Sequence, residues 1–216
     1  MTLGRGTELK EIQYPTLSLE TLRLVISSPT FLELPAFLLP LSAVAPRLTR
    51  LELTVYRALG RGFEAPLREV VSQLRCLVLD VRATLSLQEL HSHGDAFSFD
   101  RFLPACTSLR TLDLRGITFS DLEFVLELIS APLTLLRVGL RRLSRDKETQ
   151  LAAELLTLLN KPCLSMLRRW RLYGMDDVSD EPLSAVRSSG QWAEACRARG
   201  TEPRGDERYF TGECSA

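Results

Sequence analysis

Residues 107–116 read Thr-Ser-Leu-Arg-Thr-Leu-Asp-Leu-Arg-Gly and contain the pattern L-x-x-L-x-L at Leu109, Leu112 and Leu114. Alternate side chains of a β-strand point to opposite faces, so Leu112 and Leu114 would share one face of a short strand. The same pattern begins at five further places, Leu19, Leu48, Leu74, Leu133 and Leu167. Val138 and Trp170 replace a leucine in the last two. Six copies in 216 residues indicate a repeat with one strand in each copy.

The spacing of the copies leaves room for a returning segment between strands. Their first leucines are 29, 26, 35, 24 and 34 residues apart, an average of about 30, and a parallel crossover needs about a dozen or more residues. Over residues 15–175 the sequence resembles the leucine-rich repeat family. The resemblance implies an α/β fold, a leucine-rich repeat solenoid of about six repeats. Its curved parallel β-sheet would form the concave face and its helices the convex face.

Two returning segments carry clear helix signals. Residues 120–123 read Ser-Asp-Leu-Glu, which fits a capping box at a helix N-terminus. The apolar side chains that follow at helical spacing predict one buried face, made of Leu122, Val125, Leu126 and Ile129. A longer helix is predicted over residues 146–159, and the other wide spacing predicts a loop insertion at residues 83–97.

The whole chain, residues 1–216, is expected to form a single domain with one continuous core. Residues 1–15 are interpreted as an N-terminal cap or frayed start, followed by the repeats over residues 16–175. Residues 9–14 also fit the pattern, as L-x-x-I-x-Y, but they lie too close to Leu19 for a full crossover. A capping strand and a truncated preceding repeat both remain open for them.

The C-terminal part departs from the repeat pattern. Residues 190–200 read as an amphipathic helix that ends in glycine. Because a solenoid needs its last repeat covered, residues 176–205 are predicted to be a C-terminal cap. Residues 206–216 are predicted to be a flexible tail.

Composition limits the classes of partner. The chain carries 27 basic and 27 acidic side chains, and this balance argues against a broad nucleic-acid or anionic-membrane surface. Its five cysteines are widely spaced, which favours a reducing compartment, cytoplasmic or nuclear. The first residues carry no apolar signal segment and no run is long enough to span a bilayer. We expect an intracellular monomer that binds neither nucleic acid nor membrane.

Catalytic chemistry has little support in the sequence. His91 and His93 are the only histidines and lie near Asp95, which could in principle supply three metal ligands. A polar surface insertion is the favoured interpretation, because structural zinc usually takes four ligands at firmer spacing. No nucleotide-binding, hydrolase or metalloprotease motif occurs. We therefore expect no enzyme, no metal and no cofactor.

The alternation of the strands predicts which side chains face outward on the concave sheet. Each copy of L-x-x-L-x-L is hereafter called a leucine phrase, and its positions are counted from its first leucine. Positions three, five and seven of each phrase point away from the core. The candidate partner-binding residues at these positions are Glu52, Asp80, Asp113, Arg115, Arg137, Arg169, Arg171 and Tyr173. In register, Arg23 would face Glu52, Asp80 would face Arg115, and Asp113 would face Arg137. Such pairs would neutralise most central charges.

The last predicted strand differs from the others. Arg169, Arg171 and Tyr173 have no acidic neighbour on the preceding strand, and their residue types are those of protein-binding hot spots. We expect them to bind an acidic segment of a protein partner. The competing interpretation pairs these arginines, together with Arg168, with acidic residues just downstream, namely Asp176, Asp177 and Asp180.

The irregular repeats, the lack of clustered cysteines and residues 191–200 resemble those of fungal F-box and leucine-rich repeat proteins. In that family the repeats hold a target and an F-box docks on a cullin ubiquitin ligase, but no F-box can be placed in this sequence. The resemblance implies a non-enzymatic protein–protein interaction scaffold that binds a partner on its concave sheet, as in substrate recognition for an F-box-type ubiquitin ligase. The alternative is a regulator or inhibitor that covers the active site of a partner enzyme.

Overall fold

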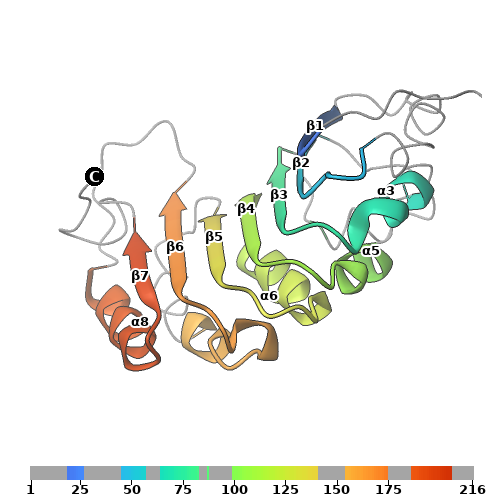
Figure 1. The fold of residues 1–216 in the computed structure, drawn as a ribbon. Helices are drawn as coiled ribbons and strands as arrows, with labels where there is room; N and C mark the ends of the chain where they lie inside the picture. Colours follow the sequence, from blue (N-terminus) through green and yellow to red (C-terminus); the bar gives the residue numbers. More distant parts are fainter. Residues whose placement is uncertain are drawn as a thin grey trace, which may run out of the picture.

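The computed structural model of the protein describes residues 19–26, 45–56, 64–82, 87, 99–140, 154–174 and 186–205. Within these residues a single seven-stranded, all-parallel sheet runs in chain order from the first strand to the last (Figure 1). Its strands are β1 (Thr21–Ile26), β2 (Arg50–Val55), β3 (Cys76–Val81), β4 (Thr111–Ile117), β5 (Leu135–Leu140), β6 (Arg169–Gly174) and β7 (Glu202–Gly205). The protein is therefore of the α/β class.

Each of the six leucine phrases contributes a strand, as predicted. The phrases are paired in register, so that Leu51, Leu77, Leu112, Leu136 and Trp170 form one row across β2 to β6. These five side chains and the leucines at the start of the same phrases are buried in one core. Leu22 and Leu24 of β1 are half-buried and pack against that core. The repeated apolar phrase therefore fixes both the strands and their register.

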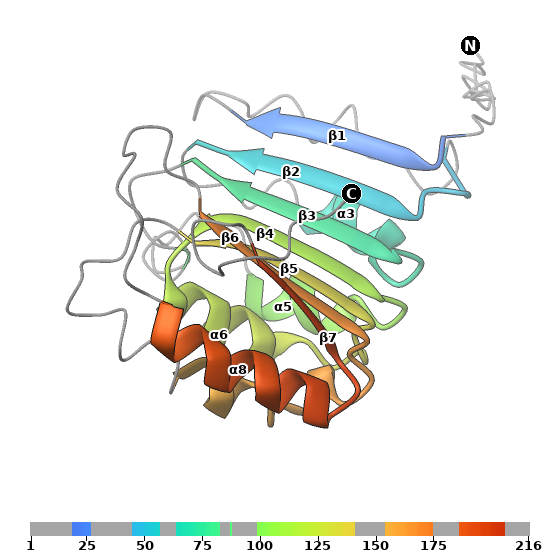
Figure 2. The ribbon, with the colours of Figure 1, turned by 90° about the vertical axis from the view of Figure 1, so that its left-hand side faces the viewer.

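The helices lie on one face of the sheet, and the sheet curves with these helices on its outer side (Figures 1 and 2). They are α3 (Glu64–Val71), α5 (Phe99–Ala105), α6 (Phe119–Leu128), the 3-10 turn η2 (Pro162–Leu164) and α8 (Val186–Ala198). Residues 154–158 are also helical and belong to the longer helix predicted from the sequence. No helix among the described residues is long and apolar enough to cross a membrane.

The predicted buried face of α6 is confirmed, but the predicted position of its cap is wrong. Leu122, Val125 and Leu126 are buried. The capping box is formed by Thr118 and Asp121, so the N-cap residue is Thr118, two residues before the predicted Ser120. Asp121 prevails because its carboxylate is fully buried, where it accepts hydrogen bonds from the Thr118 backbone N–H at 3.0 Å and from that of Leu87 at 2.7 Å. It thus ties Leu87 to the start of α6.

A glycine ends the stretch that marks the repeat. β4 has a register irregularity between Arg115 and Ile117, and Gly116 between them adopts a φ of 65°. This left-handed conformation favours glycine because it has no Cβ. The bend brings the chain from β4 to Thr118 and the start of α6.

The C-terminal cap contains the predicted helix and, in addition, the seventh strand. Trp192 of α8 packs edge-on against Trp170 of β6, with ring centroids 5.5 Å apart and both indoles buried. Gly200 then turns the chain at a φ of 72°, and the Glu202 backbone N–H donates to the Arg168 carbonyl at 2.7 Å. The sequence Glu-Pro-Arg-Gly of β7 contains none of the leucines that predicted the other strands, so this strand was missed.

Several predictions concern residues that the structure does not describe. These are residues 9–14, the tail over residues 206–216, residues 146–153 of the longer helix, and the insertion at residues 83–97 apart from Leu87.

Candidate functional site

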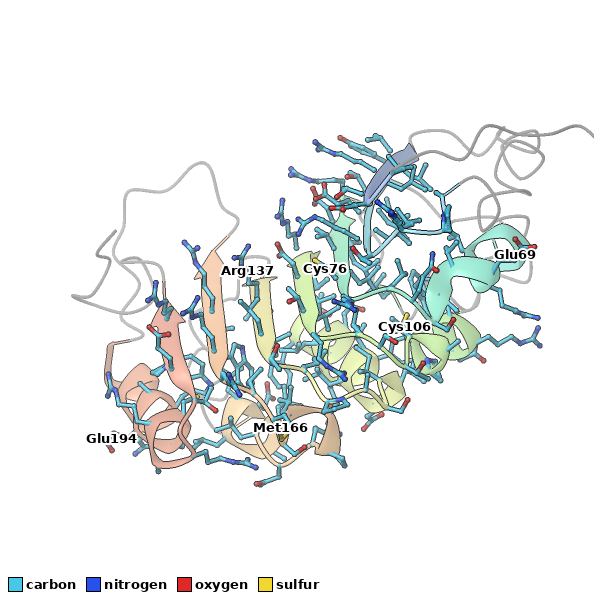
Figure 3. All side chains as sticks on the ribbon, in the orientation of Figure 1. Glu69, Cys76, Cys106, Arg137, Met166 and Glu194 are labelled. Carbon is cyan, nitrogen blue, oxygen red and sulfur yellow. The ribbon has the colours of Figure 1, made fainter. Side chains whose placement is uncertain are left out.

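The face of the sheet opposite the helices, hereafter the open face, carries positions three, five and seven of each phrase. Figure 3 shows Cys76 and Arg137 on this side, whereas Glu69, Met166 and Glu194 lie on the side of the helices. The candidate residues from Glu52 to Tyr173 all fall on neighbouring strands of this one sheet, from β2 to β6. The structure therefore brings together on one surface the residues that the repeat register predicted.

Carboxylates and arginines form two layers on the open face. Arg50 lies 2.7 Å from Glu52, Arg82 2.7 Å from Asp80, and Arg115 2.7 Å from Asp113. The carboxylate side chains are 24, 10 and 3% exposed, and their arginine partners are 38, 48 and 39% exposed. The outer layer that a partner would meet is therefore made of guanidinium groups.

These ion pairs run along single strands, which the sequence pattern did not predict. The register places Asp80 opposite Arg115 and Asp113 opposite Arg137, as expected. Each of these aspartates nevertheless makes an ion pair with the arginine two residues further along its own chain. Residues i and i+2 lie on the same face about 7 Å apart, a distance that a long arginine side chain can bridge. Arg50 and Arg82 were not among the candidate residues, although the same spacing of opposite charges could have identified them.

One predicted cross-strand pair is present. The Arg23 guanidinium lies 3.8 Å from the Glu52 carboxylate, at the predicted register position, while Glu52 also accepts a hydrogen bond from Arg50 at 2.8 Å. The Arg23 side chain is largely exposed, so its contribution to stability is at most about 1 kcal/mol.

The centre of the open face is more closely packed than the alternation alone implies. Thr54, Val78, Asp80 and Asp113 all occupy outward-facing positions and are nevertheless buried. Two of the three exposed large apolar side chains among the described residues, Val25 and Tyr56, also lie in the outward-facing rows of β1 and β2, Tyr56 directly after β2. The open face therefore combines a layer of buried side chains at its centre with partly exposed arginines and two exposed apolar side chains.

The last three strands carry a different arrangement of charge. Arg137 of β5, Arg171 of β6 and Arg204 of β7 occupy the same register position on adjacent strands. Glu202 of β7 lies 2.9 Å from Arg169 and 2.7 Å from Arg204. These two arginines, Arg204 first, hold the pKa of Glu202 below its usual value through their hydrogen bonds.

Arg169 has no acidic neighbour on β5, as expected, because it lies opposite Leu135 in the register, but it does have an acidic partner on the other side. Its partner, Glu202, lies on β7, which the leucine pattern could not predict. Arg171 is exposed, and Tyr173 lies opposite Gly139 in the register. The alternative partners, Asp176, Asp177 and Asp180, lie outside the described residues.

The described cysteines are not poised for nucleophilic chemistry. Burial raises the pKa of Cys106 to about 12, of Cys163 to about 11 and of Cys196 to about 12. Cys76 is half-buried on the open face and accepts a hydrogen bond from the Arg50 guanidinium at 3.1 Å. Burial raises its pKa as well, and the charge of Arg50 counteracts only part of that effect. A thiol attacks as its thiolate, so none of these four is activated at neutral pH.

The described residues contain no group of three or more His, Cys, Asp or Glu side chains that could hold a metal ion. His91, His93 and Asp95 lie outside that part. Comparison with models of known protein families, with curated proteins and with solved structures finds no match to this chain.

Proposed function

We propose that the protein is a non-enzymatic interaction scaffold that holds a protein partner on the open face. The observation that carries the proposal is the outer layer of that face, where half-exposed arginines stand above more deeply buried carboxylates on adjacent parallel strands. Arginine and tyrosine are enriched at the energetic centres of protein interfaces, and Tyr56 is exposed beside this layer. A sheet held by one continuous core supplies a rigid support for such a surface.

Two finer assignments belong to the same proposal. The leucine phrase recurring in register on each of the first six strands supports a leucine-rich repeat solenoid. Substrate recognition for an F-box-type ubiquitin ligase rests on the sequence resemblance, and regulation of a partner enzyme is the alternative. The identity of the captured partner distinguishes these two uses.

The test is affinity purification of partners from a cell extract with the full chain, followed by cross-linking and mass spectrometry. The open-face variant is Arg23→Glu/Arg137→Glu. The matched control is Arg68→Glu/Arg101→Glu, which makes the same change of charge at exposed positions on α3 and α5. We expect a stoichiometric partner to be lost with the first variant and kept with the second.

Equal retention of every partner by the two variants would contradict the proposal. Recovery of cullin-ligase subunits with the wild type would support the ligase assignment. Recovery of one stoichiometric enzyme, with its activity reduced in the complex, would support the regulator.

A further inference from the structure

The open face is strongly positive although the chain as a whole is neutral. Its described charged residues are eight arginines and four carboxylates, an excess of four positive charges in a chain of net charge zero. The arginines are Arg23, Arg50, Arg82, Arg115, Arg137, Arg169, Arg171 and Arg204. The carboxylates are Glu52, Asp80, Asp113 and Glu202. The compensating negative charge is therefore carried by other residues of the chain.

The excess is concentrated on β5, β6 and β7, in the row Arg137, Arg171 and Arg204, hereafter the arginine ladder. Neighbouring strands are about 4.8 Å apart, so the ladder spans about 10 Å across the sheet. Like charges directly opposite each other on adjacent strands are destabilising. The register places Arg137 and Arg171 directly opposite each other in this way.

Two members of the ladder have no counter-ion among the described residues. Neither the Arg137 nor the Arg171 guanidinium makes a hydrogen bond or ion pair with any residue that the structure describes. Arg204 shares the carboxylate of Glu202 with Arg169. Within the described part of the chain, the ladder therefore offers the donor groups of two adjacent guanidinium ions without a partner, with a third guanidinium at its end.

We propose that the arginine ladder binds an acidic segment of the partner protein, and this rests on the scaffold function proposed above. Guanidinium ions bind carboxylates through paired, charge-assisted hydrogen bonds. Side chains i and i+2 of an extended peptide point the same way about 7 Å apart. Acidic residues at alternate positions over three to five residues would therefore cover the ladder and relieve its repulsion.

A peptide fits this surface better than a nucleic acid does. A phosphate backbone needs a continuous basic path, because each neutralised phosphate adds to affinity. Next to the ladder, the same register row continues with Asp113 and Val78 on β4 and β3, and Glu52 lies beyond them on β2. The row is therefore positive over three strands and interrupted by carboxylates beyond them, which suits a short acidic segment.

The test uses fluorescence anisotropy at low ionic strength with the full-length chain and three defined probes. These are a labelled nine-residue peptide of alternating glutamate and glycine, the same peptide with lysine in place of glutamate, and a ten-nucleotide oligothymidylate. The ladder variant is Arg137→Glu/Arg171→Glu and the control is Arg68→Glu/Arg101→Glu. A milder variant, Arg137→Gln/Arg171→Gln, keeps the test valid if charge reversal disturbs folding.

The glutamate peptide should bind the wild type and the control equally and lose at least about tenfold in affinity with the ladder variant, because like charges then face each other. Its affinity should also fall as salt is added, since the Debye length is about 8 Å at physiological ionic strength. Equal affinity of the ladder and control variants would overturn the proposal. Tighter binding of the oligothymidylate, or no binding of the glutamate peptide, would overturn it as well.

The outcomes separate this proposal from the scaffold function. If partners captured from extract depend on the open face while the glutamate peptide is indifferent to the ladder, the acidic segment is refuted and the scaffold stands. If no captured partner depends on the open face, the scaffold itself is refuted, whatever the peptide does.

Discussion

Replacing Asp121 by alanine is expected to destabilise the protein more than any surface change, because this carboxylate is buried and fully engaged. It accepts hydrogen bonds from the Leu87 N–H at 2.7 Å, the Thr118 N–H at 3.0 Å and the Thr118 hydroxyl at 2.9 Å. The Thr118 hydroxyl in turn accepts from the Asp121 N–H at 3.2 Å, which completes the cap of α6.

The magnitude follows from the donors that lose their acceptor. Alanine at position 121 would leave the backbone N–H groups of Leu87 and Thr118 without this partner. The Leu87 N–H bond is buried, and an unsatisfied buried donor costs about 1–3 kcal/mol, whereas losing the part-buried Thr118 N–H bond costs about 0.5–1.5 kcal/mol, so the two together give about 1.5–4.5 kcal/mol. Asp121→Asn should cost less, because it retains one acceptor oxygen and replaces the other with a donor.

Urea denaturation monitored by circular dichroism measures this loss as a change in the free energy of unfolding. The matched control is Glu123→Ala, two residues along α6, where a half-exposed carboxylate lies 3.7 Å from Lys161. We expect less than about 0.5 kcal/mol for the control. A loss below about 1 kcal/mol for Asp121→Ala would refute the argument that its carboxylate organises the start of α6.

Three further results are expected. Arg171→Val should raise the free energy of unfolding by about 0.2–1 kcal/mol in urea titrations, because it removes the middle charge of the arginine ladder. The hydrogen bonds from Arg204 and Arg169 lower the pKa of Glu202, so they should stabilise β7 fully at pH values above the ordinary pKa of 4.5. This stabilisation should be lost as the pH falls through the lower pKa of the folded protein, and hydrogen exchange of the β7 amides would detect the loss. Cys106, Cys163 and Cys196 should resist iodoacetamide at pH 8 until the protein is unfolded, as mass spectrometry would show.

The strands and their register could be predicted because the same physical demand recurs in each repeat. Every copy must bury two alternating side chains and one before the strand, so Leu109, Leu112 and Leu114 have counterparts on each of the other strands from β1 to β6. β7 escaped prediction because its backbone pairs with β6 without contributing leucines to the core. The cap of α6 was misplaced because Ser120 matches the capping pattern as well as Thr118 does, and only the buried carboxylate of Asp121 decides between them.

The candidate site was predictable in its location and less so in its pairing. Strand alternation placed the outward-facing rows correctly, including Arg137 and Arg171 on neighbouring strands. It could not show that Asp80 and Asp113 are buried beneath arginines of their own strands, since that depends on how closely the open face packs. The ion pair between Glu202 and Arg169 could not be predicted, because the leucine pattern did not predict β7.

The most direct test of the open face as the binding surface is site-specific photo-cross-linking in extract. A benzophenone amino acid would be placed at position 135, an outward-facing position on β5 beside the arginine ladder, or at position 101, on α5, of the otherwise unchanged full chain. We predict that position 135 cross-links one partner, at or beside an acidic segment of that partner, and that position 101 does not. Cross-linking of the same partner from position 101 with none from position 135 would contradict this binding surface.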